Sequence, residues 1–405
     1  SNSFCTLLPK ETTMPPKKAE EKKSKTVLLG RPGASLKMGI VGLPNVGKST
    51  FFNLLSNKHV PAENRPFCTI DPNSADINIP DDRFEKLCKI HNPASKVPAQ
   101  LHVRDIAGLV SGASTGLGLG NAFLSHISEV DGIFHMCRAF DDVDVTHVEG
   151  EVDPTRDLDI IFSELVAKDL QSVNKTMDAL KPVVARGIDK TKKQDLEYLE
   201  KVKAHLEAGK QIRCGEWSNK EIDYINTLHL LTAKPAVFLV NMSARDYLRQ
   251  KNKWLPKIKA WIDEHTEEPM IPFSAEFEVD VHNQGDHEAQ QKYLAEHKVK
   301  SQLPRIITTG FKQINLIYFF TAGPDEVRCW TIQKHWLAPQ AAGRIHTDME
   351  RGFICAEVIH WEDFDRLESE AKCKEEGKYM QQGRNYEVLD GDICFFKFNP
   401  KGGKK

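Results

Sequence analysis

Nine consecutive residues, Gly42–Thr50, limit what this chain can fold into more than any other stretch. They read Gly-Leu-Pro-Asn-Val-Gly-Lys-Ser-Thr and contain the pattern G-x-x-x-x-G-K-S. The apolar run Met38–Val41 precedes them, and a helix-like segment, Phe51–Leu55, follows. A glycine-rich turn between a strand and a helix presents backbone N–H groups and the positive end of the helix dipole to an anion. The arrangement predicts a phosphate-binding loop in an α/β domain that binds a nucleoside triphosphate.

Two side chains of this loop have chemistry suited to phosphate. Lys48 is long enough to reach the terminal phosphates, and the Ser49 hydroxyl can bind Mg²⁺. A tight turn that contains Lys-Ser by coincidence is the alternative. The strand and the helix expected on either side disfavour that alternative, because they are the context in which the motif functions.

A second motif completes the expected metal site. The alternating segment Ala99–Asp105 is typical of a strand and ends in Asp-x-x-Gly, with Gly108 as the glycine. A carboxylate there can bind Mg²⁺, usually through water, while the glycine amide can contact the γ-phosphate. Thr69 lies between the two motifs, where a switch threonine would offer its hydroxyl to Mg²⁺. The predicted metal ligands are therefore Ser49, Thr69 and Asp105.

Composition narrows the class of protein further. The net charge is −2 over 405 residues, so any nucleic-acid contact must come from a local patch. Nine cysteines without a C-x-x-C pair favour reduced thiols in a cytosolic protein. The apolar runs are far shorter than the roughly 18 residues of a membrane span. The chain does not begin with Met, and Met14 looks like a more natural start, so we expect residues 1–13 to be an upstream or artificial extension.

The pattern along the chain indicates three parts. Residues 1–34 carry a Lys-, Glu- and Pro-rich stretch and are expected to be a disordered N-terminal segment. Residues 36–290 form the nucleotide-binding domain, and helical periodicity within 157–225 predicts an inserted antiparallel helical hairpin. Strands, turns and many aromatic residues in 315–398 predict a small, separate α+β domain.

The turn after the strand Ala236–Asn241 indicates which nucleotide base the site binds. Ras-like GTPases place Asn-Lys-x-Asp after a late buried strand, and the Asp accepts hydrogen bonds from guanine. Here the strand Ala236–Asn241 is followed by Met242, and Ala244 stands where the Asp is expected. Each guanine donor left unpaired would cost on the order of 1–3 kcal/mol. The adenine amino group can instead be read by Asn241 and the Met242 backbone, so the sequence favours ATP over GTP, with a GTPase as the alternative.

The residue expected to orient the attacking water is also missing. Leu109 follows Gly108 where Ras-type enzymes have Gln, and leucine cannot hydrogen-bond water. Hydrolysis must then be slow or assisted by another group. Asn45 matches the position that holds K⁺ in monovalent-cation-dependent P-loop enzymes, and His147 follows the next strand in a loop that can face the switches. A loop histidine is more often a surface residue, so position alone gives His147 little weight.

A basic helix follows the base-reading turn. Its exposed face is expected to carry Arg249, Lys251, Lys253, Lys257 and Lys259, with Trp254 and Trp261 nearby. Basic and aromatic side chains together can bind RNA, but a solvated helix face is the favoured interpretation of such a run.

Taken together, these motifs resemble those of the Obg-like ATPases, the YchF group of the Obg-related P-loop NTPases. The resemblance extends over nearly the whole chain from Met14. The segments that carry it are Gly42–Thr50, Pro66–Thr69, Asp105–Val110, Gly118–His126, His147–Asp153, the Asn241 region, Phe320–Arg328 and Ala338–Glu357. It implies an OBG-type nucleotide-binding domain, the helical hairpin insertion and a C-terminal TGS domain, which is a small β-grasp-like module.

The resemblance also implies roles for particular residues. The nucleotide-binding residues would be Asn45, Val46, Gly47, Lys48, Ser49, Thr50, Asn241 and Met242, the last contacting adenine through its backbone. His147 matches the histidine proposed to assist hydrolysis in the family, and it joins Lys48 as an expected catalytic residue. The family usually has an acidic residue where Ala244 stands, so this departure can tune base affinity without removing a phosphate contact.

The function implied by the resemblance is that of an ATP-hydrolysing molecular switch that uses Mg²⁺ and, through Asn45, K⁺. The family implies association with the ribosome or a ribosomal subunit, contact with RNA, and regulation of translation or stress responses. The expected location is the cytoplasm, with the nucleus as an additional compartment and no membrane. A nucleotide-gated binding module with incidental hydrolysis is the alternative of a different class.

Overall fold

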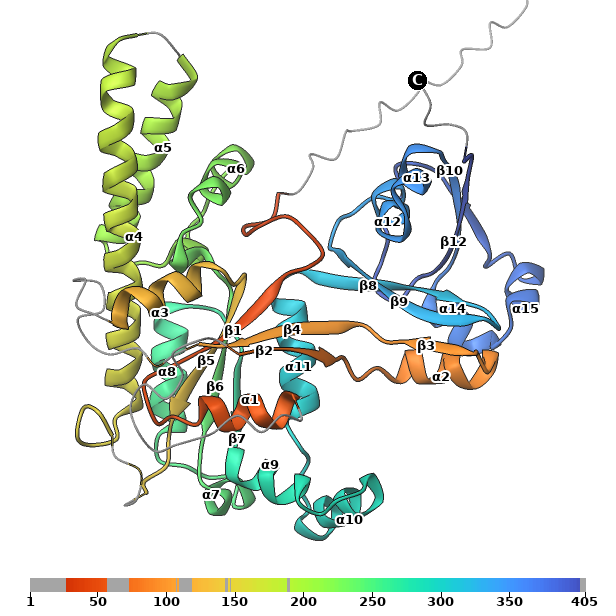
Figure 1. Ribbon diagram of the computed structural model, residues 1–405, viewed down its shortest axis with the longest axis horizontal. Helices are drawn as coiled ribbons and strands as arrows, with labels where there is room; N and C mark the ends of the chain where they lie inside the picture. The colour runs from red at the N-terminus through yellow and green to blue at the C-terminus, as the bar shows by residue number, and fades with distance from the viewer. Residues whose placement is uncertain are drawn as a thin grey trace, which may run out of the picture.

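Two six-stranded sheets, both flanked by helices, form the framework of the chain (Figure 1). The computed structural model describes residues 27–56, 73–106, 108, 119–142, 145, 147–187 and 190–400. The expectations for residues 1–26, for Thr69 and for Leu109 therefore lie outside the described residues. No helix among the described residues is both long and apolar enough to cross a membrane.

The first sheet has the strand order β2-β4-β1-β5-β6-β7. Its strands are β1 (Lys37–Val41), β2 (Ser74–Asn78), β4 (Gln100–Asp105), β5 (Gly132–Arg138), β6 (Ala236–Asn241) and β7 (Met270–Phe273). Only the edge strand β2 runs antiparallel to its neighbour. Every residue of β5 and β6 is buried, as expected for central parallel strands covered on both faces. Their carboxyl ends meet at one edge, where ligands bind in sheets of this type.

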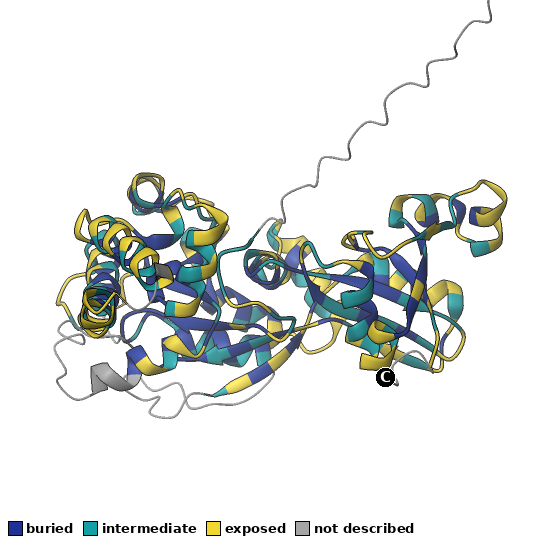
Figure 2. Cartoon of the chain, turned by 90° about the horizontal axis from the view of Figure 1, so that it is seen from above, coloured by how far each residue is buried: buried dark blue, intermediate teal, exposed yellow. Residues whose placement is uncertain are grey.

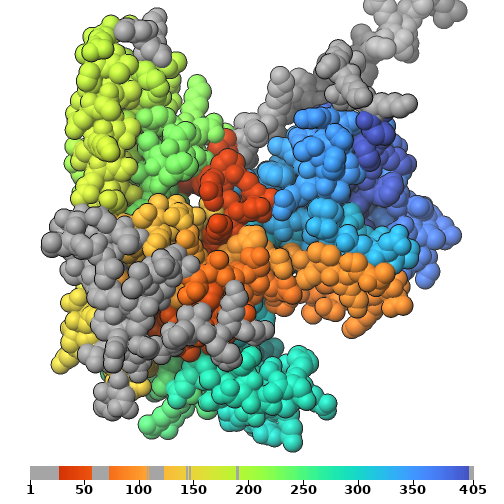
Figure 3. Space-filling view, viewed as in Figure 1, coloured from red at the N-terminus to blue at the C-terminus, as the bar shows by residue number. Residues whose placement is uncertain are grey.

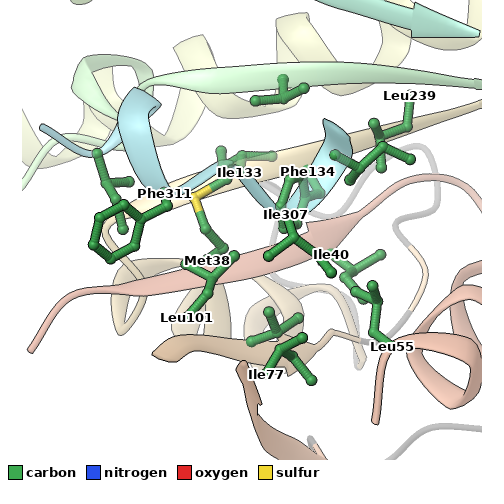
Figure 4. Packing of buried hydrophobic residues seen from close by; sticks show 14 of the residues in the cluster. Met38, Ile40, Leu55, Ile77, Leu101, Ile133, Phe134, Leu239, Ile307 and Phe311 are labelled. Carbon is green, nitrogen blue, oxygen red and sulfur yellow. The ribbon is translucent and has the colours of Figure 1, made fainter. Parts of the chain in front are cut away.

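Helices flank this sheet. They are α1 (Lys48–Ser56), α3 (Leu119–Ser128), α7 (Ala244–Leu248), α8 (Leu255–His265), α9 (Ala275–His282), α10 (His287–His297) and α11 (Leu303–Gln313). Among them, α10 packs on α9 and not on the sheet itself (Figure 1). Ile307 and Phe311 of α11 belong to the same buried cluster as Met38 and Phe134 (Figure 4). A Cβ atom on Gly310 would lie 2.3 Å from the Phe134 ring, so α11 comes this close to β5 because residue 310 has no side chain.

The inserted hairpin is present as the periodicity predicts. It consists of α4 (Pro154–Ala185) and α5 (Lys190–Glu207), and α6 (Asn219–Leu228) follows. The Asp153 side chain accepts hydrogen bonds from the first-turn amides of α4, and Pro154 begins the helix with its preset backbone. Val173, Met177 and Leu199 are buried in the seam between the helices. The outer faces are exposed (Figure 2), which fits the Lys- and Glu-rich sequence of α5.

The second sheet has the order β11-β10-β12-β8-β9-β3. It contains β8 (Leu316–Ala322), β9 (Glu326–Gln333), β10 (Phe353–Ile359), β11 (Met380–Gln382) and β12 (Ile393–Phe398), with helices α12 (Ala338–Ile345), α13 (Thr347–Arg351), α14 (Trp361–Leu367) and α15 (Glu370–Glu375). Its sixth strand, β3 (Ser95–Val97), comes from the first half of the chain and pairs in parallel with β9. Three residues are too few to show an alternating pattern, so the sequence did not reveal this strand.

A cluster of four polar side chains, the Arg83 cluster, joins the two sheets. Arg83 lies in the first turn of α2 (Asp82–His91); its Nε donates to Asp81 at 3.0 Å and its Nη1 donates to Asp390 at 3.1 Å. The Tyr318 hydroxyl donates to Asp81, and the Arg83 guanidinium lies 5.4 Å from the centre of the Tyr318 ring. In Figure 3 the segment around α2 runs directly beneath the C-terminal strands. The two sheets are therefore connected by charge and ring stacking as well as by β3.

Burial by itself raises the pKa of Asp81, but hydrogen bonds from Arg83 and Tyr318 outweigh it and hold the pKa below its usual value. The cluster therefore favours the ionised carboxylate. Its contribution to stability is complete above the ordinary pKa of 3.8 and is lost as the pH falls through the folded-state pKa.

Replacement of Arg83 by Ala should lower the free energy of unfolding by about 1–2 kcal/mol, because Asp81 loses a charge-assisted hydrogen bond in a half-buried position. Urea unfolding measures the change, and hydrogen exchange should become faster in α2 and around Asp390. The matched control is Lys181→Ala, which removes an exposed ion pair with Asp178 and should cost less than ~0.5 kcal/mol. Equal effects of the two substitutions would contradict a joining role for the Arg83 cluster.

A candidate nucleotide-binding site

The phosphate loop lies between β1 and α1, where the motif predicts it. Asn45 has φ 59° and Gly47 has φ 99°, so two residues of the loop adopt left-handed backbone conformations. Lys48 is buried, and its Nζ donates to the Leu43 carbonyl oxygen at 2.8 Å. The lysine side chain thus folds back across the loop that is expected to hold the phosphates.

Two glycines of the motifs are required by close approaches. A Cβ atom on Gly47 would lie 2.6 Å from Nδ2 of Asn241, and one on Gly108 would lie 2.9 Å from the Pro44 nitrogen. Any side chain at either place would push the phosphate loop away from its neighbours. The Asp-x-x-Gly turn therefore packs directly on the phosphate loop, as expected for two halves of one site.

Asn241 ties the loop to the rest of the domain, and the sequence analysis did not anticipate this role. Its Nδ2 donates to the Val46 carbonyl oxygen at 3.0 Å, and its Oδ1 accepts from the Ala275 N–H at 3.0 Å. The residue is 4% exposed. One amide side chain at the end of β6 therefore joins the phosphate loop to the start of α9. Its predicted contact with adenine stays a prediction.

The candidate Mg²⁺ ligands are adjacent. Ser49 Oγ donates to Asp105 Oδ2 at 3.0 Å, and Asp105 is completely buried at the end of β4. A hydroxyl and a carboxylate are hard oxygen donors, which suit Mg²⁺ better than softer metals. These two residues fit an ion that, when bound, would neutralise phosphate charge. Thr69, the third predicted ligand, lies outside the described residues.

Arg138 is a functional candidate that the sequence analysis missed. It ends β5, is 1% exposed, and donates from Nη2 to the Val145 carbonyl oxygen at 2.8 Å and from Nη1 to the Asn45 carbonyl oxygen at 3.5 Å. Burial lowers its pKa, against the opposing effect of nearby carboxylates that include Asp157. The guanidinium thus connects the phosphate loop to the segment that leads to His147. An arginine at the end of a strand whose other residues are apolar except for His135 was the available signal.

His147 is not a surface residue. It is 6% exposed; the Glu149 N–H donates to its Nδ1 at 3.1 Å, so the ring proton is on Nε2, which donates to Asp157 Oδ2 at 2.9 Å. Burial raises the pKa of Asp157, with His147 and Arg156 opposing the increase. Both ring nitrogens are engaged in this arrangement, so orienting a water would require His147 to leave Asp157. Its catalytic role stays a prediction.

The base-reading turn contains a carboxylate that the sequence analysis did not place there. Glu276 accepts a hydrogen bond from the Ala244 N–H at 2.9 Å through Oε2. The Met242 N–H donates to the Phe273 carbonyl oxygen at 2.9 Å, so a backbone contact to adenine would have to use the Met242 carbonyl oxygen. The Met242 side chain is buried beside Tyr247.

Asn241→Ala should weaken nucleotide binding by about tenfold or more, because the Val46 carbonyl and the Ala275 amide both lose their partner at the loop. Titration of Mg·ATP by calorimetry measures the Kd. The matched control is Asn226→Ala, because Asn226 makes the same pair of bonds to the Leu28 carbonyl oxygen and the Gly30 N–H, far from the site. The control should lower stability and leave the Kd unchanged; equal Kd values in both variants would contradict the role of Asn241.

Comparisons with known proteins agree with this geometry. The family model described as "50S ribosome-binding GTPase" matches residues 37–164, and the YchF-GTPase C-terminal model, described as a protein of unknown function, matches residues 316–399. The chain is 56% identical to Obg-like ATPase 1 of Oryza sativa subsp. japonica over 97% of this chain and 100% of the relative. It is 55% identical to Obg-like ATPase 1 of Homo sapiens, with the same shares of the two chains covered.

A solved structure shows the same architecture. The YchF GTPase of Schizosaccharomyces pombe is 50% identical and superposes with a TM-score of 0.82, over 92% of this chain and 100% of that chain. A GTP-binding protein from Pyrococcus horikoshii OT3, 18% identical with a TM-score of 0.53 over 90% of this chain and all of its own, shares the fold. With this identity over nearly the full length and a phosphate site built as described, the chain belongs to the Obg-like ATPase (YchF) family of P-loop nucleotide-binding proteins.

Proposed function

We propose that this protein is an ATP-hydrolysing molecular switch. The observation that carries the choice of base is Ala244, which stands in the base-reading turn where guanine-specific enzymes have an aspartate. The names of the relatives differ on this point, since some are called ATPases and the Schizosaccharomyces pombe structure is called a GTPase. The choice between ATP and GTP therefore depends on this chain's own residues.

Glu276 bears on the same question. It brings a carboxylate to the turn, but its Oε2 already accepts the Ala244 N–H, and it comes from α9 rather than from the turn itself. Guanine presents two adjacent donors, N1–H and the 2-amino group, which a carboxylate at position 244 would accept together. The adenine 6-amino group needs fewer acceptors, which supports ATP as the preferred nucleotide.

The substitution Ala244→Asp should shift the preference towards GTP by about tenfold or more, because it restores an acceptor for guanine donors that otherwise cost on the order of 1–3 kcal/mol each. The ratio of the Kd values for ATP and GTP measures the shift. Ala244→Asn is the matched control, since it has nearly the same size and only one acceptor oxygen, and its ratio should change less. Tighter binding of GTP than of ATP by the unsubstituted protein would refute the ATP assignment.

Hydrolysis in this proposal depends on few protein groups. Lys48 and Mg²⁺, held by Ser49 and Asp105, would stabilise the charge on the transferring phosphate. Asn45 would hold a K⁺ ion that supplies further positive charge, so the rate in KCl should exceed that in NaCl. Once the His147 ring has separated from Asp157, His147 would assist the attacking water.

His147→Ala should reduce the ATP hydrolysis rate by about ten- to a hundredfold and leave the Kd of ATP nearly unchanged, because the loss of a positioned acid or base affects the transition state and not the bound nucleotide. Single-turnover hydrolysis and equilibrium binding measure the two quantities. His205→Ala is the control, since that histidine bonds to the Gln211 carbonyl oxygen within the helical insertion. An unchanged rate in His147→Ala would remove this residue from the mechanism.

The proposed output is binding to a ribosome or ribosomal subunit, with regulation of translation or stress responses in the cytoplasm and also in the nucleus. Support comes from the family model described as a 50S ribosome-binding GTPase. Contact with RNA is proposed at the start of α8, where Lys253 and Lys257 lie 5.3 and 4.9 Å from the Trp254 ring and Lys253 also forms an exposed ion pair with Asp141 at 3.1 Å. Co-sedimentation with ribosomes under ATP, ADP and no nucleotide tests this output.

The same assay distinguishes the alternative of a binding module with incidental hydrolysis. If nucleotide binding alone controls the partner, Lys48→Ala should change co-sedimentation and His147→Ala should not. If hydrolysis drives the switch, both substitutions should change it.

A further inference from the structure

A cavity of about 460 Å³ opens at the β7 edge of the first sheet, next to the base-reading turn. Residues from the turn after β6, from α7, α8 and β7, from the connections between α7 and α8 and between α10 and α11, and from α11 line it. No residue of the phosphate loop, Gly42–Thr50, contributes to its lining. Its volume lies within the range of roughly 300–1,000 Å³ that small-molecule sites occupy.

The inner wall of the cavity is apolar. Met242 and Tyr247 are buried side chains of a small hydrophobic cluster, and Leu255 and Val299 pack against that cluster. Pro272 of the edge strand β7 completes the wall. Such a wall stabilises an aromatic or branched hydrocarbon group by removing its surface from water.

The rim of the cavity is cationic. Lys298, Lys300 and Arg305 line it with exposed side chains, and none of the three forms an ion pair with a carboxylate among the described residues. The neighbouring carboxylate, Glu278, is occupied elsewhere, because its two oxygens accept from Ser301 Oγ and the Gln302 N–H, each at 2.7 Å. The rim also lies at the N-terminus of α11, whose dipole adds positive potential. These charges favour an anion.

A hydrogen-bonded pair of side chains, Gln302 and Tyr247, lies on the polar side of the cavity. Gln302 lines the cavity and donates from Nε2 to the Tyr247 hydroxyl at 3.1 Å, while that hydroxyl donates to the Lys300 carbonyl oxygen at 2.6 Å. The Oε1 atom of Gln302 is buried and accepts no hydrogen bond from any residue in the described part of the chain. The bonded pair of Gln302 and Tyr247 therefore holds the polar side of the cavity in one arrangement.

We propose that this cavity is a second ligand site, separate from the nucleotide site. Its ligand class is a small organic anion with two parts: an aromatic or branched apolar body against Met242 and Pro272, and a carboxylate, phosphate or sulfonate at the cationic rim.

Anilinonaphthalene sulfonate has both parts and serves as the probe. Titration into the full chain should give saturable fluorescence with one site per chain. The chain has eight methionines, so methyl-labelled methionine gives a small NMR spectrum in which Met242→Leu assigns the Met242 signal. That signal should shift as the probe binds in the presence of saturating Mg·ATP, which locates the probe in the cavity and not at the nucleotide site, where Met242 is also a predicted contact.

Arg305→Ala should raise the probe's Kd by about tenfold, because the sulfonate loses a charged partner. Lys300→Ala is a second variant that should also raise the probe's Kd, so it tests the charge of the rim even if Arg305→Ala fails to fold. The matched control is Lys292→Ala, which removes the same charge from an exposed position on α10 outside the cavity, and its Kd should stay within about twofold.

Saturating Mg·ATP should leave the probe bound and its Kd nearly unchanged. Displacement by Mg·ATP together with an unaltered Kd in Arg305→Ala and Lys300→Ala would overturn the proposal, because the probe would then occupy the nucleotide site. Titration without saturation, or a Met242 signal that does not move, would overturn it as well.

Discussion

The amide side chain of Asn241 is the interaction on which the rest of the site depends. A phosphate loop that binds through backbone N–H groups works only if its backbone is held in one conformation. Here a single buried side chain accepts from the start of α9 and donates to the loop, so three strand-to-helix turns meet at the carboxyl edge of the sheet. Gly47 has no side chain because Asn241 occupies the space where one would be. The contact between Gly47 and Asn241 therefore requires both residues: the glycine leaves the space, and the asparagine side chain fills it.

A second set of contacts, made by Arg138, places a buried positive charge next to the phosphate loop. Arg138 carries a guanidinium into an almost fully buried position, where nearby carboxylates partly offset the cost of removing that charge from water. It connects the phosphate loop to the segment that leads to His147, and His147 in turn is bonded to Asp157 in the first turn of α4. The long helical hairpin thus begins one hydrogen bond away from the proposed catalytic histidine. The His147–Asp157 hydrogen bond therefore links the segment around His147 directly to the first turn of α4.

The two sheets are joined in a way that links the nucleotide side to the C-terminal side. The strand β2, the helix α2 and the strand β3 follow one another in the chain, and β3 adds to the edge of the second sheet. The Arg83 cluster holds the same segment against β8 and the turn before β12. The strand β2, which pairs with the strand that ends in Asp105, is therefore connected to the second sheet through α2 and β3.

The sequence by itself determined the local parts of this protein. The phosphate loop, the strand that ends in Asp105, the helical insertion and the buried strand Ala236–Asn241 all depend on short-range patterns, and the structure places each element within a few residues of its predicted bounds. Only the tertiary structure decided which distant residues meet. The Asn241 bonds, the Arg138 contacts, the Glu276 carboxylate beside Ala244 and the pairing of β3 with β9 join positions whose separation leaves no periodic trace in one sequence. Periodicity reports which face of an element is buried, and it does not report which partner buries it.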